Sequence, residues 1–341
     1  MQDTLSVNAA NNLDLGGAWG AGMDFFMQSE DEKAQYVANY LASNASTLER
    51  DEYETLSDRM IQVYQENLVG ISDLQGAGLT RSISLATQVD LWQTVSEFSE
   101  AEVTMDGEAQ SENDAVTYTT DGVPVPIVHK DFRISERELQ TSRRMNNDLR
   151  TDNVAAATRQ VTEKLEEVLF QGWAPNVSTK RGDSFELYGY TNHPDRNTHS
   201  GSDWGTAGNI RDDVVAMLDE LDIDDIQPPY GIYVARPQYR QFRSAIDPDG
   251  DGNLTVRERI MQEFDSEIEF IKPAAKLPDG EAVGVKMSPD VVELAMAEDI
   301  QTIEWTSGSG MTNFYKVMAA MAPEIKSDAT GASGVVHATG L

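Results

Sequence analysis

The sequence predicts an α+β fold for this chain of 341 residues. Three observations point to it. Residues 151–172 repeat apolar side chains at helical spacing. Residues 97–120 alternate polar and apolar side chains on both sides of an acidic tip, which is typical of a long β-hairpin. Residues 209–300 alternate helical and strand patterns, which indicates a separate α/β domain.

Residues 1–75 are predicted to form an N-terminal arm followed by helices. Residues 1–28 are rich in Asn, Gly and Ala, show no periodicity and carry no signal-peptide pattern. Helical spacing then runs over 30–69, where Ser46 and Glu49 have the spacing of a capping box, and Gly70 marks the expected end. Because such an arm has no core of its own, we expect it to be ordered only against another chain.

Residues 76–135 are predicted to hold an extended hairpin loop with its flanking strands. Strand patterns cover 101–105 and 116–119, and the tip between them is acidic. A free hairpin of this kind is marginally stable at best, so we expect it to lie on another surface.

Residues 136–208 form the next expected region, with the long helix 151–172 followed by a loop-rich stretch. Thr151 or Asp152 is the expected N-cap, and Gly172 the expected end. The apolar stripe of the helix consists of Val154, Ala157, Val161, Leu165 and Val168.

Residues 209–300 are predicted as one domain and residues 301–341 as extended C-terminal strands. In the domain we expect helices at 209–221, 237–246 and 256–264 and strands at 230–235 and 268–271. Asp279 and Gly280 have the pattern of a hairpin turn that leads to strands at 282–287 and 291–296.

The composition is strongly acidic. The chain has 58 Asp and Glu residues against 26 Lys and Arg, a net charge of -32, and few of the basic residues are lysine. Such charge repels itself in dilute buffer, but molar salt shortens the Debye length to about 3 Å. The composition therefore favours a hypersaline environment, and the alternative is an ordinary acidic soluble protein. No dense basic cluster indicates nucleic-acid binding, and no apolar run approaches the roughly 20 residues of a membrane span.

The stretch Ala245–Arg259, "AIDPDGDGNLTVRER", has the pattern of a twelve-residue calcium loop. The predicted ligands, in loop order, are Asp247, Asp249, Asp251, Asn253, Thr255 and Glu258, with Gly252 at the bend and Leu254 at the apolar position. Sensors pair such loops, and this chain has a single one, so we expect structural Ca²⁺ rather than a switch. The alternative is an acidic turn, since Asp-Gly and Pro-Asp form turns readily.

Catalytic patterns are weak throughout the chain. Because there is no cysteine, disulfides, thiolate metal sites and cysteine nucleophiles are excluded. His193 and His199 lie in a polar loop, and no Gly-x-Ser-x-Gly motif or phosphate-binding glycine loop is present. Carboxylate pairs are too numerous to indicate acid–base chemistry, so the sequence predicts a protein that is not an enzyme.

The order of these parts resembles the major capsid proteins of tailed double-stranded DNA viruses, whose fold is shared by encapsulin shells. The resemblance covers roughly residues 75–341. It implies an extended loop, a peripheral domain with a spine helix, an axial domain at 209–300 and peripheral strands at 301–341. The segments that carry it are the acidic hairpin 97–120, "GVPVPIVHKDFRIS" at 122–135, "ERELQTSRR" at 136–144 and "VLFQG" at 168–172.

The same resemblance implies a structural shell protein. Its partners would be copies of itself, as hexamers and pentamers of an icosahedral capsid, with scaffolding, portal or decoration proteins as candidates. The shell would enclose viral DNA without binding it sequence-specifically, and no membrane would take part. The virions would be assembled in the host cytoplasm. The acidic composition then points to a tailed virus of a halophilic archaeon. One alternative is an encapsulin-type compartment holding a cargo enzyme, and another is a calcium-dependent soluble enzyme or binding module. The hairpin contains no lysine, so the loop-lysine cross-link of some relatives is not expected.

Overall fold

The computed structural model describes residues 69–96, 103, 105, 115–144, 149–178, 184–243 and 254–341. Of these, residues up to 132, residues 149–303 and residues 316–341 belong to one compact unit, and residues 133–144 and 304–315 to a second. The predicted arm and helices of residues 1–68 lie outside the described residues, as does most of the hairpin tip.

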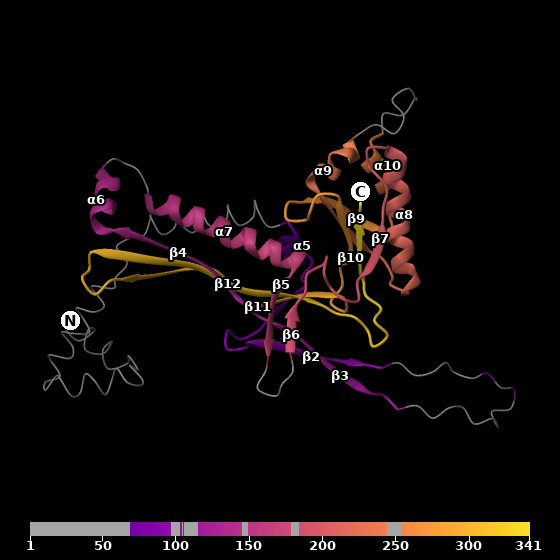
Figure 1. Ribbon diagram of the computed structural model, residues 1–341, viewed down its shortest axis with the longest axis horizontal. Coiled ribbons are helices and arrows are strands. Elements are labelled where there is room, and N and C mark those ends of the chain that lie inside the picture. The colour runs from indigo at the N-terminus through magenta and orange to yellow at the C-terminus, as the bar shows by residue number, and fades with distance from the viewer. Residues whose placement is uncertain are drawn as a thin grey trace, which may run out of the picture. The chain divides into compact units, whose positions relative to one another are not determined.

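A five-stranded sheet with helices packed on it organises one part of the larger unit (Figure 1). α8 and α10 share one buried apolar cluster with the sheet, in which Ile210 and Ile260 meet Ile232 and Val336. All six residues of β8 are buried, as expected for a central strand. The strand order is β7 (Asn197–Ser200), β13 (Val335–Thr339), β10 (Glu281–Lys286), β8 (Tyr230–Ala235) and β9 (Ile268–Ala274), and the helices are α8 (Ala207–Ile223), α9 (Arg236–Tyr239), η1 (Gln241–Arg243) and α10 (Val256–Glu263).

Most elements predicted in this region are confirmed, with two corrections. Gly280 does take a positive φ of 81°, but the strands on its two sides are not a hairpin, because β8 lies between β9 and β10. The helix expected over 237–246 divides into α9 and the short 3-10 helix η1, and residues 244–246 lie outside the described part.

The long predicted helix is α7 (Leu149–Gln171), and it buries the expected apolar stripe. Gly172, at φ +74°, ends it as predicted. The expected capping is wrong, because α7 begins before Thr151 and Asp152, which therefore lie inside its first turn.

A four-stranded sheet has the order β1 (Thr80–Ser82), β11 (Val292–Thr306), β12 (Thr312–Ile325) and β4 (Ile127–Ser135). β11 runs well beyond the strand expected at 291–296. The C-terminal strands divide between the two sheets, since β12 lies in this one and β13 in the five-stranded one.

In the second unit, helix α6 (Glu136–Arg144) begins at a capping box. The Ser135 hydroxyl donates to the Glu138 carboxylate at 2.8 Å, and the Glu138 N–H donates back to the Ser135 oxygen at 3.3 Å. The rings of Trp305 and Phe314 stack with centroids 5.6 Å apart.

Two short hairpins complete the larger unit. β2 (Val89–Val95) and β3 (Tyr118–Pro124) pair antiparallel, which confirms the base of the predicted hairpin. β5 (Trp173–Ser178) and β6 (Ser184–Leu187) pair in the stretch expected to be loop-rich. That expectation was wrong because these strands are short and have little apolar alternation.

Candidate functional site

The β2–β3 pair is a two-stranded ribbon with an apolar outer face. Leu91 and Val95 are 52% and 48% exposed, and Tyr118, directly opposite Val95 in the register, is 66% exposed. Opposed residues of an antiparallel pair share a face, so these three side chains line one side of the ribbon. Gly122, opposite Leu91, leaves room for the leucine, because a Cβ there would lie 2.5 Å from its Cδ2.

A cavity of about 310 Å³ lies where the ribbon meets the β5–β6 hairpin and the loop 188–195. Trp92, Phe185, Tyr188 and His193 line its walls, and Pro323 and Ile325 of β12 complete them. The lining also includes Asp121, Glu186 and Asp195, and it contains no Lys or Arg among the described residues. The chain therefore builds a small aromatic cavity surrounded by negative charge.

Burial shifts the pKa of two lining side chains, and the neighbouring carboxylates act on both. Burial raises the pKa of the Tyr188 phenol, and the charges of Glu186, Asp121 and Asp195 raise it further. Burial lowers the pKa of His193, while Asp195 and Asp121 act in the opposite direction. Asp121 and Asp195 therefore act on the titration of both rings.

A buried carboxylate joins α7 to α5 (Gly70–Gly76). Glu166 Oε1 accepts the backbone N–H groups of Gly70 at 2.9 Å and Val69 at 3.2 Å. Gly70 therefore begins α5, and the helix predicted to end at this residue lies outside the described part of the chain. Burial raises the pKa of Glu166 to about 7, although the backbone N–H donors lower it.

The same helix α5 is tied to the five-stranded sheet. The Asp73 carboxylate accepts the Tyr233 hydroxyl at 3.0 Å and the Lys272 ammonium at 2.6 Å. Tyr233 alternates with the core residues of β8, so its ring lies on the opposite face of the sheet and packs edge-to-face on Phe170 at 5.4 Å. α5 therefore links α7 to the sheet through charged and aromatic contacts.

An ion-pair network contacts the β2–β3 ribbon at Asp90 of β2. The Arg81 guanidinium contacts Asp90 at 2.6 Å and Glu324 at 2.5 Å, and Lys326 pairs with Glu293 at 2.5 Å. Glu324 is fully buried, and its Oε2 has no hydrogen-bond partner among the described residues. Burial raises the pKa of Glu324, and Arg81 lowers it. The network joins β2 to β1, β11 and β12.

The calcium prediction falls mainly outside the described residues, which include neither Asp247, Asp249, Asp251 nor Asn253. Thr255 and Glu258 are described and form the capping box of α10, with the Thr255 N–H and hydroxyl donating to Glu258 Oε2 at 2.9 Å. These hydrogen bonds lower the pKa of Glu258. A carboxylate and a hydroxyl at the start of a helix suit the end of a calcium loop, so the described end fits the predicted site.

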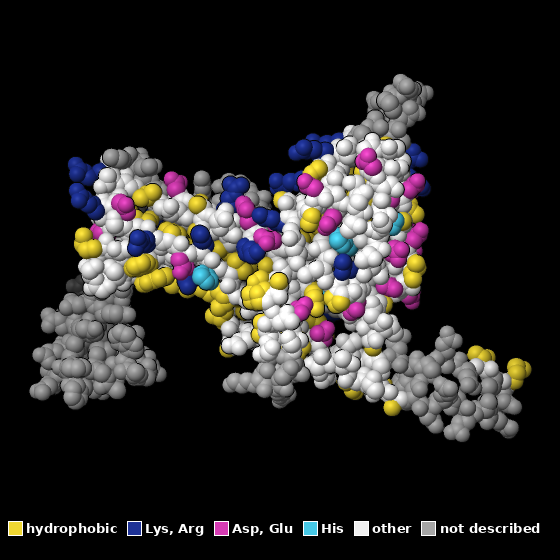
Figure 2. Space-filling model, in the orientation of Figure 1, with side chains coloured by type: hydrophobic (Ala, Val, Ile, Leu, Met, Phe, Trp, Pro, Cys, Tyr) yellow, Lys and Arg dark blue, Asp and Glu magenta, His cyan; other side chains and the backbone are white. Residues whose placement is uncertain are grey.

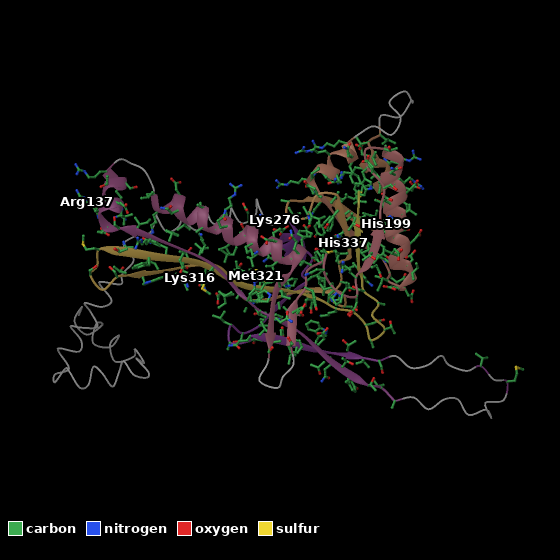
Figure 3. The ribbon with its side chains drawn as sticks, in the orientation of Figure 1. Arg137, His199, Lys276, Lys316, Met321 and His337 are labelled. Atoms are coloured by element: carbon green, nitrogen blue, oxygen red, sulfur yellow. The ribbon has the colours of Figure 1, made fainter. Side chains whose placement is uncertain are left out.

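All four histidines lie near carboxylates, and two of them, His199 and His337, are labelled in Figure 3. His129 lies 3.3 Å from Asp131. His193 lines the cavity, and His199 lies 3.3 Å from the buried Asp213. His337 lies 3.0 Å from Glu281, and burial lowers its pKa. In the described ranges no group of three or more His, Asp or Glu side chains has the geometry of a metal site, and none of the described helices is long and apolar enough to cross a membrane.

Sequence reasoning missed the cavity, Glu166 and the Arg81 network. One signal for Glu166 exists, because Thr158, Thr162 and Glu166 recur every four residues beside the apolar stripe of α7 and are all buried. Trp92 is a wall of this cavity and also packs on a buried cluster that includes Val168 and Leu187.

Solved structures of a virus-like particle and of phages have a similar fold. The chain of a virus-like particle from Pyrococcus furiosus superposes with a TM-score of 0.60 and 14% identity, covering 84% of this chain and 98% of that one. The capsid of Myoviridae phage XM1 superposes with a TM-score of 0.63 and 12% identity, covering 81% of this chain and 93% of that one. A chain of Microbacterium phage Oxtober96 superposes with a TM-score of 0.55 and 13% identity, covering 77% of this chain and 89% of that one.

These likenesses establish that the chain has the tailed-phage capsid fold, as the sequence resemblance implied. At the level of sequence, residues 42–338 match a family of unknown function, DUF6260, and the chain belongs to that family.

Proposed function

We propose that this chain is a major capsid protein that assembles into a closed icosahedral shell around viral double-stranded DNA. The apolar outer face of the β2–β3 ribbon carries the proposal. Leu91, Val95 and Tyr118 are exposed on a two-stranded ribbon, which has too little core to be stable alone. Laid on a neighbouring copy, that face would bury apolar area at about 25 cal/mol per Å², repeated on every subunit.

The remaining parts of the proposal concern partners and setting. The subunits would form hexamers and pentamers, with scaffolding, portal or decoration proteins as further partners, inside virions assembled in the host cytoplasm. DNA would be enclosed without sequence-specific contacts, and the protein would have no enzymatic role. The net charge of -32 supports a virus of a halophilic archaeon, because strong salt would screen repulsion between subunits and DNA.

Calcium is part of the proposal as a structural ion. Thr255 and Glu258 would hold it together with Asp247, Asp249, Asp251 and the carbonyl of Asn253. Four carboxylates within twelve residues repel one another unless a divalent cation neutralises them, and Ca²⁺ accepts six to eight oxygen ligands. The ion would fix the loop that precedes α10.

Electron microscopy of the purified chain in molar salt tests the shell. We expect closed particles from the natural chain and none from the triple variant Leu91→Ser, Val95→Ser, Tyr118→Ser, which should remain folded. Ile223→Ser is the matched control, because Ile223 is 76% exposed on α8, away from the ribbon. A natural chain that stays a small monodisperse species would overturn the proposal and favour the soluble enzyme or binding module.

A second candidate is an encapsulin-type compartment. The fold is similar to that of a virus-like particle as well as to that of a phage capsid, so the likeness alone does not separate a compartment from a capsid. The contents of particles from the native source decide between the two, since a capsid would hold DNA and a compartment would hold a cargo enzyme.

A further inference from the structure

We propose that the aromatic cavity at the base of the β2–β3 ribbon binds an arginine side chain presented by α6 of a second copy of this chain. The inference rests on the proposed function, because it needs subunits in contact. It assigns to the cavity a ligand class, the guanidinium group, and to α6 a role in assembly.

The cavity has the chemistry of a guanidinium site. Trp92, Phe185 and Tyr188 offer ring faces, on which an arginine stacks through cation–π contact. Asp121, Glu186 and Asp195 supply negative charge to a lining that holds no described Lys or Arg, although Arg196 donates to the His193 carbonyl beside it at 2.7 Å. At about 310 Å³, the volume lies at the lower end of small-molecule pockets, about 300–1,000 Å³, and suits one long side chain.

The carboxylates of the cavity can still accept hydrogen bonds from a bound guanidinium group. Asp121 Oδ1 accepts the N–H of Gly122 at 2.7 Å, and Asp195 Oδ2 accepts the hydroxyl of Ser327 at 2.7 Å. Each therefore has a second oxygen available, and a carboxylate can accept several hydrogen bonds in all. Arginine donates five N–H groups in a planar fork, which matches converging carboxylates better than the single ammonium of lysine does.

α6 supplies the complementary charge. Arg137 and Arg144 are exposed and seven residues apart, so they share one face of the helix, while Leu139 and Ser142 are buried on another. In Figure 3 the labelled Arg137 side chain points away from the ribbon of α6. Figure 2 shows Lys and Arg side chains gathered over this helix.

The overall charge favours such a contact during assembly. Two copies that each carry -32 repel one another unless basic groups of one face acidic groups of the other. Molar salt weakens an exposed ion pair, but a pair sheltered by aromatic walls is screened much less. Since each copy has both the cavity and α6, the contact is heterologous and repeats from subunit to subunit.

Engineered cysteines test the contact directly, because the natural chain has none. One preparation carries Asn176→Cys, at the exposed rim of the cavity, and a second carries Arg144→Cys. Mixed, assembled and oxidised, they should give a disulfide-linked dimer of the two variants. Arg240→Cys, on an exposed arginine outside α6, is the matched control and should give none with Asn176→Cys.

A double-variant cycle measures the coupling. The pair Arg137→Gln, Arg144→Gln and the pair Asp121→Asn, Glu186→Gln should each raise the critical concentration for assembly about tenfold, and combining them should add little. Arg236→Gln with Arg240→Gln controls for the loss of two positive charges, and thermal melting of each unassembled variant confirms folding.

The outcomes separate this inference from the proposed function. If the natural chain forms no shells at all, both the proposed shell function and the cavity contact are overturned. Normal shells that show no Asn176–Arg144 cross-link and purely additive losses would overturn the cavity contact alone. So would binding of free guanidinium ion to the unassembled chain at millimolar concentration without any cross-link, since the cavity would then be a site for a small cation.

Discussion

The backbone N–H of Gly70 donates a 2.9 Å hydrogen bond to the carboxylate of Glu166, across 96 residues of sequence. The acceptor lies on α7 and the donor in the first turn of α5, so a buried acid on one helix caps another. An anion at a helix N-terminus is stabilised by the unpaired N–H groups and the helix dipole. Asp73, Tyr190 and Tyr233 surround this junction, and burial together with the neighbouring Tyr190 and Asp73 raises the pKa of Tyr233.

Glu166 should make stability depend on pH. Burial raises its pKa from the ordinary 4.5 to about 7, so the folded state holds more protons than the unfolded state between these values. Its contribution is full below about pH 4.5 and is lost as the pH rises through about 7. Glu166→Gln keeps an acceptor for Gly70 without the charge, so thermal unfolding from pH 4.5 to 8 should show a flatter profile. Glu167→Gln, exposed on the same helix, should keep the natural slope.

Removing the guanidinium of Arg81 should destabilise the fold. Arg81→Gln leaves Asp90 and the fully buried Glu324 without their cation. Breaking a buried pair costs about 3–5 kcal/mol, and the exposure of Arg81, 39%, places this loss at the lower end. Chemical unfolding of Arg81→Gln should show the loss, and adding Glu324→Gln should restore much of it. If the double variant is as unstable as the single one, the Glu324 charge is not the cause.

The shell should become less stable as the salt concentration is lowered. Lowering salt from molar to about a tenth molar lengthens the Debye length from about 3 to about 10 Å, so subunits that each carry -32 charges repel one another over a longer range. Particles should dissociate over this range in light scattering. Replacing the salt with sucrose at equal osmolality should not prevent it. Particles with the same melting temperature at both salt concentrations would contradict a hypersaline origin.

Calcium should be retained by the loop before α10. Asp251→Ala removes one predicted ligand, so the calcium content of particles washed in high sodium should drop and the melting temperature should fall with it. Asp265→Ala, an exposed acid just beyond α10, is the control and should change neither. Elemental analysis of both variants measures the ion. Equal calcium in the two would mean that the stretch is only an acidic turn.

Much of the fold was predictable because local periodicity encodes local backbone. The apolar stripe of α7, the pattern of α8 and the buried run of β8 each depend on residues a few positions apart. The acidic composition and the calcium-type spacing are likewise properties of the chain itself. Of the two hairpin strands predicted by alternation, the one at 116–119 overlaps β3, whereas β2 precedes the strand expected at 101–105, where the described residues 103 and 105 are not in a strand.

The errors arose where a partner distant in sequence decides the local structure. The helix α5, which begins at Gly70, was not predicted, and the carboxylate that caps it comes from Glu166 on α7. Asp279–Gly280 was expected to form a hairpin, but β8 takes the place between the two strands.

The sequence alone therefore determined the α+β class, the positions of the main helices and strands, the negative charge and the spacing of the calcium-type loop. Only the tertiary structure placed Arg81 against Glu324, 243 residues away, and closed an aromatic cavity among three carboxylates. The physical reason is that side-chain spacing determines which face of a helix or strand is apolar, whereas burial and long-range hydrogen bonds determine which faces and charges meet.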